Sequence, residues 1–283
     1  MEVIVNPEGR VQSFQDKKAL NVVSMKNIKV RYTQSGPVVL DIERLDVRKG
    51  DRVSIIGPSG AGKTTLLRLI NGYVNPESGH IKIFEYDNDM GSIRQRNLGR
   101  RIGFIFQHFN LIDRATVFEN VLWGRLGIVN PFLSLFGWFP ERDKKAAIRA
   151  IKEVNLEEQA GQRTDTLSGG QLQRVAIARV LAQEAEIILA DEPVSNLDPS
   201  LADDILGLLG EVSSRHGVTL IMNLHQPALA LHYADRIIGL RQGRIVYDNE
   251  ARFLSPISLR SIFDPGINIS QMFSSNVQEK PSH

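Results

Sequence analysis

A glycine-rich segment between a strand pattern and a helix pattern constrains this 283-residue chain more than any other feature. Residues 51–56, DRVSII, form a β-branched run that predicts a buried strand, and residues 64–70, TTLLRLI, have the pattern of a helix. The segment GPSGAGKT, residues 57–64, fits the phosphate-loop pattern G-x-x-x-x-G-K-[ST]. A glycine-rich turn with a surface lysine is the alternative, but the flanking strand and helix favour a phosphate-binding loop.

The residue types of this loop suit a nucleoside triphosphate. Glycines allow successive backbone N–H groups to approach phosphate oxygens, and the helix N-terminus adds the positive end of its dipole. Lys63 is expected to contact the β- and γ-phosphates, and the hydroxyl of Thr64 is expected to ligate Mg²⁺. The predicted nucleotide-binding residues are Gly57, Pro58, Ser59, Gly60, Ala61, Gly62, Lys63, Thr64 and Thr65.

Alternating strand and helix patterns predict an α/β fold with a parallel sheet. Buried strands are expected at residues 186–191 and 218–224, and helices at residues 171–183 and 201–214. Such alternation implies parallel strands that are joined by crossover helices.

Further regions are expected beside this core. The runs at residues 25–33 and 38–47 flank a Ser-Gly-Pro turn and predict an antiparallel β layer. Residues 116–159 have a helical pattern, which predicts an inserted α subdomain. Residues 1–22 and 250–283 are polar or irregular, so we expect the C-terminal one to be a weakly ordered tail.

Composition excludes several kinds of site. With 34 Lys and Arg against 32 Asp and Glu, the net charge of +2 gives no general reason to expect nucleic acid as a partner. The absence of cysteine excludes disulfides, thiolate metal ligands and a cysteine nucleophile. No secretory signal is visible, so a cytoplasmic location is the default expectation. The longest uncharged stretch, residues 126–140, is shorter than the about 20 residues that a membrane-spanning helix needs.

Two carboxylates follow an apolar strand pattern at residues 187–190, IILA. Asp191 is placed to orient Mg²⁺ through its water shell, and Glu192, one residue further, is placed to polarise the water that attacks the γ-phosphate. Two solvated loop charges are the alternative reading of this pair. The phosphate loop in the same chain favours the functional interpretation.

A second anion-binding pattern leads to a known family. The segment LSGGQ, residues 167–171, starts a helix with a hydroxyl and free N–H groups. Together with the following LQRVAIARVLA, with ILADEP and with SNLD, it resembles the ATP-binding cassette (ABC) transporter ATPase family over about residues 24–248. The resemblance implies a P-loop NTPase fold of the ABC cassette type, with a parallel-sheet core, an antiparallel β layer and an inserted α-helical subdomain.

The same resemblance implies a division of the chain into domains. Residues 1–23 would be an N-terminal extension, and residues 24–249 would be the ABC ATPase domain. The helical subdomain would occupy about residues 115–165, and residues 250–283 would be the C-terminal tail.

The resemblance also implies how the motifs work together. Two copies would pack head to tail around two ATP molecules, with Ser168 and Gly170 of one copy facing the phosphate loop of the other. Gln107 in IFQHFN matches the Q-loop glutamine, which reaches Mg²⁺ and couples the site to a membrane partner. Asp198 in SNLD matches the D-loop, and His225 in NLHQ matches the switch histidine that touches the γ-phosphate.

The expected site residues therefore fall into two functional groups. Catalytic roles are expected of Lys63, Gln107, Glu192 and His225, and Mg²⁺ contacts of Thr64, Gln107 and Asp191. Tyr32 matches the family's A-loop aromatic, which stacks on adenine, although a core or edge-strand tyrosine is an equally open interpretation.

Three features favour a transport ATPase over soluble relatives. The chain has one cassette, it lacks a long heptad insertion, and its α subdomain begins directly after the Q-loop. A permease helix would dock between the Q-loop and this subdomain. The aromatic stretch Phe132–Phe139 would be part of that docking surface, or it would fold into the subdomain's own core; both readings stay open.

Residues 107–127, QHFNLIDRATVFENVLWGRLG, and residues 135–140, LFGWFP, resemble the ATP-binding subunit of phosphonate importers. The resemblance implies an ATP-hydrolysing subunit that powers the import of phosphonates or related phosphorus oxyanions. Its cofactors would be ATP and Mg²⁺, and its partners a second copy, a permease and, indirectly, a substrate-binding protein at the cytoplasmic face of the membrane. An importer ATPase for phosphate or an amino acid, and a soluble ABC ATPase, are the alternatives.

Overall fold

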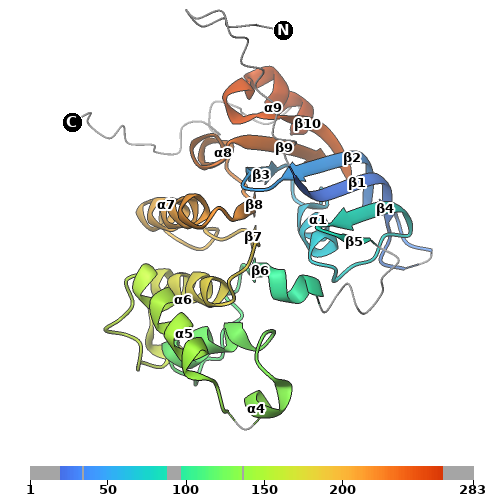
Figure 1. Cartoon of the computed structure of the whole chain (residues 1–283). Coiled ribbons are helices and arrows are strands. Elements are labelled where there is room, and N and C mark those ends of the chain that lie inside the picture. The colour runs from blue at the N-terminus through green and yellow to red at the C-terminus, as the bar shows by residue number, and fades with distance from the viewer. Residues whose placement is uncertain (1–19, 34, 88–96, 136, 264–283) are drawn as a thin grey trace, which may run out of the picture.

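The fold is built on two β-sheets with helices on both sides of the larger one (Figure 1). The computed structural model describes residues 20–33, 35–87, 97–135 and 137–263. The larger sheet has six strands in the order β10-β9-β3-β8-β7-β6, and the smaller has four in the order β2-β1-β4-β5.

Five strands of the larger sheet run parallel and one is antiparallel. The parallel strands are β3 (Arg52–Ile56), β6 (Ile102–Ile105), β7 (Ile187–Asp191), β8 (Thr219–Asn223) and β9 (Arg236–Arg241), and β10 (Arg244–Glu250) pairs antiparallel with β9. Alternate side chains of β7 belong to different hydrophobic clusters. Ile187 and Leu189 belong to one cluster, and Ile188 and Ala190 belong to the other. A sheet that is buried on both faces explains why the strands read as continuous apolar runs.

The smaller sheet covers one face of this core. It consists of β1 (Asn21–Val30), β2 (Leu40–Arg48), β4 (Ser78–Ile83) and β5 (Tyr86–Asp87), all paired antiparallel. Its inward side chains form a cluster with those of α1 (Lys63–Ile70) and one face of the larger sheet. The predicted antiparallel layer and the predicted parallel core are therefore confirmed.

The other face of the larger sheet is covered by α6 (Gly169–Ala182), α7 (Pro199–His216) and α8 (Pro227–Tyr233). The start of α7 follows directly from its sequence. Asp198 caps it by accepting hydrogen bonds from the backbone N–H groups of Ser200 and Leu201, and Pro199 occupies the first turn. Gly217 ends the helix with φ 63°, a conformation that glycine adopts without strain.

The predicted helical region lies at one end of the molecule, where Figure 1 shows α4, α5 and α6 together. It contains α3 (Val117–Leu122), a 3₁₀ turn at Trp123–Arg125, α4 (Pro131–Leu135) and α5 (Glu141–Glu153). Arg125 attaches this region to the core. Its Nε lies 2.9 Å from Oδ1 of the fully buried Asp143 on α5, and its Nη1 donates to the carbonyl of Ala182 at the end of α6.

The C-terminal part of the chain differs from the sequence expectation. A 3₁₀ turn at Ala251–Phe253 and α9 (Pro256–Ile262) follow β10, and Leu259 and Ile262 of α9 are fully buried in the main cluster. A weakly ordered tail is therefore wrong for residues 251–263. The side chain of Ile262 packs directly over Gly239, where a Cβ would come within 2.4 Å of Ile262 Cγ1. Residues 264–283 lie outside the described part.

Element boundaries also shift at the N-terminal side. Strand β1 begins at Asn21, three residues before the expected domain start at residue 24, and β4, β5, β6, β9 and β10 were not anticipated from the sequence. Of the expected N-terminal extension, residues 1–23, residues 1–19 lie outside the described part of the chain. The division into domains itself stays a prediction.

In the aromatic stretch Phe132–Phe139, some side chains are buried in the core and others are exposed as a docking surface would be. Phe139 is buried in the main cluster, whereas the side chains of Phe132 and Trp138 are 78% and 74% exposed. Phe136 lies outside the described residues. Among the helices that the structure describes, none is both long and apolar enough to cross a membrane.

Candidate nucleotide-binding site

The expected site residues that follow strands β3, β7 and β8 meet at one edge of the larger sheet. Because β3, β7 and β8 are parallel, their carboxyl ends lie on the same side. The phosphate loop follows β3, Asp191 is the last residue of β7, and His225 comes two residues after β8. The edge of a parallel sheet at its carboxyl ends is the place where α/β proteins bind ligands.

The glycines of the loop are required by close contacts and by backbone conformation. A Cβ at Gly57 would lie 2.1 Å from the carbonyl oxygen of Leu240, and one at Gly62 would lie 2.8 Å from Cδ2 of Leu40. Gly60 and Gly62 have φ values of 77° and 101°, which other residues rarely adopt. Any side chain at these positions would distort the loop that precedes α1.

Lys63 is folded back onto the loop. The residue is buried, and its Nζ donates to the carbonyl oxygens of Gly57 at 2.8 Å and Pro58 at 3.0 Å. Burial lowers the pKa of Lys63, and the carboxylates of Glu192 and Asp191 oppose that shift. The ammonium group is therefore held beside the loop by neutral oxygens, and a phosphate would offer it a charged partner.

Thr64 and Asp191 are brought together as the sequence predicted. The Thr64 hydroxyl donates to Asp191 Oδ1 at 3.1 Å, and the Asn223 amide donates to the same oxygen at 2.6 Å. Hydroxyl and carboxylate oxygens are the ligands that Mg²⁺ prefers, and a Mg²⁺ site needs only one or two protein oxygens when phosphates supply others. These residues fit the ion. The described residues contain no cluster of three or more His, Cys, Asp or Glu that would hold a metal without the nucleotide.

Glu192 and His225 form a close pair. Glu192 Oε1 lies 2.5 Å from His225 Nε2, with the glutamate side chain 18% and the histidine side chain 42% exposed. Glu192 has φ 52°, which is uncommon outside glycine and costs free energy. Non-glycine residues in this conformation cluster at functional sites, and here the turn follows β7 directly.

Gln107 and Tyr32 approach the site from other segments. Gln107 Nε2 donates to Ser195 Oγ at 3.3 Å, just beyond Glu192. Tyr32 is 55% exposed and lies two residues beyond the end of β1, so it is neither a core nor a strand residue. Its hydroxyl lies 3.0 Å from Oγ1 of the buried Thr65. A largely exposed ring whose hydroxyl contacts a residue of the phosphate-loop helix is accessible to a bound nucleotide, as stacking on adenine requires.

The signature segment starts α6 with a capping box. Ser168 Oγ accepts from the backbone N–H of Gln171, and Gln171 Oε1 accepts from the backbone N–H of Ser168 at 2.9 Å. Ser168 and Gly169 are exposed, whereas Gly170 is buried against Leu201. Among the described residues, no hydrogen bond joins this segment to the phosphate loop, so the chain does not bring the two anion-binding motifs together.

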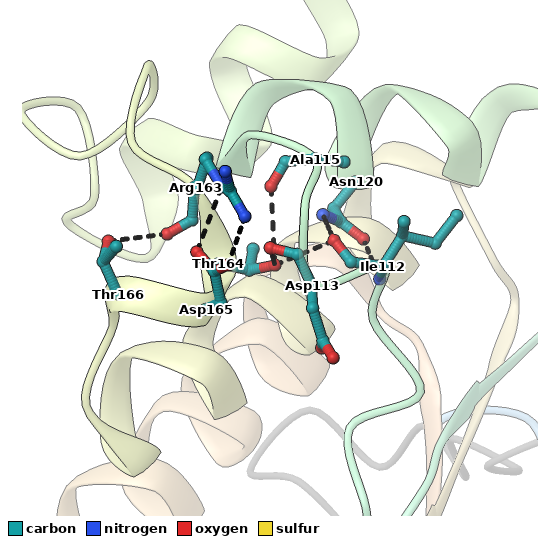
Figure 2. Close-up of polar contacts among 8 residues, drawn as sticks. All are labelled: Ile112, Asp113, Ala115, Asn120, Arg163, Thr164, Asp165 and Thr166. Atoms are coloured by element: carbon teal, nitrogen blue, oxygen red, sulfur yellow. Dashed lines mark hydrogen bonds and ion pairs between the residues drawn. The ribbon is translucent and has the colours of Figure 1, made fainter.

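The segment before the signature is tied to the segment after Gln107 by a buried polar cluster. Thr164 donates from its backbone N–H to the carbonyl of Ala115 and from its hydroxyl to the carbonyl of Ile112, at 3.0 and 2.9 Å. Asn120 accepts from the N–H of Ile112 and donates to its carbonyl. Figure 2 shows Asn120 and Thr164 both pointing toward the backbone of Ile112. Neither side chain was singled out from the sequence, where threonine and asparagine carry no distinctive signal.

Asn223 was also not anticipated from the sequence. A signal was present, because an asparagine ends a strand whose other residues are apolar or β-branched. It pairs in register with Asp191, which only the sheet topology reveals.

Comparisons with known proteins agree with this geometry. The sequence model of the family described as ABC transporter matches residues 40–195. A protein of Cupriavidus metallidurans named Phosphonates import ATP-binding protein PhnC 2 is 44% identical over 255 residues, which cover 90% of this chain and 91% of the relative. A protein of the same name from Halalkalibacterium halodurans is 45% identical over 219 residues, covering 77% and 89%.

Solved structures give the same result. A dimeric ATP-binding cassette in a post-hydrolysis state, bound to ADP and Pi, superposes with a TM-score of 0.70 at 32% identity and covers 82% of this chain and 100% of its own. The protein cbiO1 from Clostridium perfringens, part of an ABC transporter complex, gives a TM-score of 0.73 at 28% identity, covering 82% and 89%. Because the family model covers more than half of the chain and both relatives match most of it, the chain belongs to the ABC transporter family of ATP-binding proteins.

Proposed function

We propose that this chain is the ATP-hydrolysing subunit of an importer for phosphonates or related phosphorus oxyanions. The observation that supports the ATPase site best is the convergence of the phosphate loop, Asp191 and the Glu192–His225 pair at one sheet edge. The solute class rests on the names of the relatives at 44% and 45% identity.

Each part of the site has a defined task in this proposal. The loop N–H groups and Lys63 bind the phosphates, and Tyr32 stacks on adenine. Thr64, Asp191 and Gln107 would hold Mg²⁺, which would neutralise charge on the phosphate oxygens when bound. Glu192 takes a proton from the attacking water, and His225 contacts the γ-phosphate.

A second copy completes the site. The partner's Ser168 would supply its hydroxyl, and the partner's Gly170 its N–H group, to the γ-phosphate side of the nucleotide. Support comes from the exposed helix start in this chain and from the dimeric form of the similar cassette. ATP would then favour the closed dimer, because only that state makes contacts from both copies.

The proposed location is the cytoplasmic face of a membrane, on permease subunits that receive solute from a binding protein. The exposed side chains of Phe132 and Trp138 support a contact surface on the helical region. No residue of this chain needs to touch the solute, so phosphate and amino acids are the competing solute classes.

Reconstitution with the permease and binding protein tests the proposal. ATP hydrolysis is measured with phosphonates, phosphite, phosphate and amino acids, and we expect stimulation by phosphonates or phosphite. Stimulation by phosphate or by amino acids alone would identify another importer. Hydrolysis that responds to nucleic acid without any permease would instead identify a soluble ABC ATPase.

A further inference from the structure

The amide of Asn223 occupies a place that packing alone does not explain. All five residues of β8 are buried, and Asn223 is 0% exposed, between Ile55 of β3 and Asp191 of β7. An apolar side chain would suit such a position better, because burying an amide costs free energy unless all its polar atoms are paired.

Only half of this amide is paired. Asn223 Nδ2 donates to Asp191 Oδ1 at 2.6 Å, whereas Asn223 Oδ1 is buried and accepts no hydrogen bond from any residue that the structure describes. The amide orientation follows from chemistry. A carboxylate only accepts hydrogen bonds, and turning the amide over would set two oxygens against each other. An asparagine retained for stability would satisfy both atoms, so the unpaired oxygen points to a functional reason.

Two donors converge on one carboxylate oxygen. Thr64 Oγ1 and Asn223 Nδ2 both donate to Asp191 Oδ1, and among the described residues nothing donates to Asp191 Oδ2. Two hydrogen bonds from different elements, α1 and β8, fix the plane of the carboxylate. The other oxygen is left available for the water shell of the ion that the proposed site holds.

We infer that Asn223 is a positioning residue for Mg²⁺, which acts by orienting the Asp191 carboxylate. The inference rests on the proposed function and adds a residue to the site. Groups that hydrogen-bond to metal-binding residues tune metal affinity, and their loss costs about 10- to 100-fold. Asn223 also lines a cavity of about 230 Å³ together with Glu192 and His225. The residue therefore lies beside both the metal-orienting carboxylate and the hydrolytic pair.

An isosteric pair of variants tests the inference. Asn223→Thr replaces the amide donor with a hydroxyl that can donate to Asp191, whereas Asn223→Val has the shape of threonine and no donor. Mn²⁺ affinity of the complex with a non-hydrolysable ATP analogue is measured by electron paramagnetic resonance on the full chain. We expect the Val variant to bind Mn²⁺ about 10- to 100-fold more weakly and the Thr variant to stay close to wild type. Nucleotide affinity in EDTA should be equal in all three proteins.

Ser54→Ala is the matched control. Ser54 lies on the adjacent strand β3, is 0% exposed, and its Oγ is also buried without a hydrogen-bond partner among the described residues. It has no hydrogen bond to Asp191, so this variant should bind Mn²⁺ as wild type does.

Equal Mn²⁺ affinity in the Val and Thr variants would overturn the role of Asn223. A folded Thr variant that binds Mn²⁺ as weakly as is expected of the Val variant would overturn it as well. If the Val variant does not fold, Asn223→Leu, whose side chain branches at Cγ as that of asparagine does, replaces it and has the same expected loss. Failure of the proposed function gives a different result: wild-type protein itself would then bind the nucleotide no better with Mn²⁺ than in EDTA.

Discussion

The phosphate-loop edge and the signature segment are both built to bind anions, yet they differ in how complete they are. At the edge, the functional side chains already have partners within the chain. Lys63 donates to a backbone oxygen of its own loop, Thr64 donates to Asp191, and Glu192 contacts His225. At the signature segment, Ser168 and Gln171 hydrogen-bond to each other in the capping box, and among the described residues no side-chain hydrogen bond ties this pair to another part of the chain. One region is assembled by the fold of a single chain, whereas the other is a prepared helix start without a ligand from its own chain.

The largest expected effect is a loss of ATP hydrolysis without a loss of ATP binding at the phosphate-loop edge. Glu192→Gln keeps the shape of the side chain but cannot accept a proton, so ATP turnover should fall by roughly 10²- to 10⁴-fold while ATP binding persists. Turnover is measured by phosphate release and dimerisation by size-exclusion chromatography with ATP. Glu211→Gln on the exposed side of α7 is the control and should not change turnover. Wild-type turnover in the Glu192 variant would show that the base lies elsewhere.

The next effect tests whether the signature segment works only across a dimer. Ser168→Asp keeps a good helix cap but places a negative charge at the helix start. We expect monomer stability and ATP binding to persist and turnover to fall by about 100-fold, because like charges at an interface cost several kcal/mol. Ser168→Asn, which caps without charge, is the control. Equal turnover in both variants would remove the signature segment from the site.

A substitution in the buried polar cluster of Asn120 and Thr164, which ties the segment after Gln107 to the segment before the signature, should have a smaller effect, and that effect is on stability. Thr164→Val removes the hydroxyl that donates to the carbonyl of Ile112 in a buried setting, so the free energy of unfolding should fall by about 1–2 kcal/mol. Thr166→Val is the control, because Thr166 is exposed although it makes a similar local bond to Arg163. Urea denaturation measures both. Equal losses would mean that burial of the cluster does not matter.

Substitutions of Tyr32 test whether an aromatic ring contributes to ATP binding at the phosphate-loop edge. Tyr32→Leu removes the aromatic face and should weaken ATP binding by roughly tenfold, since stacking of a base is worth about 1–3 kcal/mol. Tyr32→Phe removes only the contact between the hydroxyl and Thr65, so its ATP affinity should be close to wild type. Fluorescence titration with ATP measures both affinities. Equal weakening in the two variants would assign the effect to the hydroxyl.

The smallest effect concerns the pH dependence of stability without nucleotide. Burial lowers the pKa of Lys63 from its ordinary 10.5, so the charged form is less favourable in the folded state than in the unfolded state. Relative to Lys63→Met, wild-type protein should therefore gain stability as pH rises from the lowered pKa toward 10.5. Thermal unfolding at neutral and at alkaline pH measures the gain. A wild-type protein that instead loses stability relative to Lys63→Met as pH rises would contradict the sign of this shift.

Much of the fold followed from local patterns. The largely apolar, β-branched run before Gly57 predicted β3, and the apolar run before Asp191 predicted β7, because a strand buried on both faces has few polar positions. Strand β10 was harder to predict, since its burial alternates between half-buried and exposed residues. Helix α9 was missed because its proline and two serines resemble a loop, although two buried side chains hold it to the core.

The sequence by itself determined the chemistry of the site, because the phosphate loop, the acidic strand end and the signature segment are each contiguous and their residue types have few alternative uses. Only the tertiary structure decided which groups work together. Asn223 and Asp191 are 32 residues apart, and Asn120 and Thr164 meet on one backbone segment. Such contacts depend on strand order and register, which arise from packing across the whole sheet and cannot be deduced from any single segment.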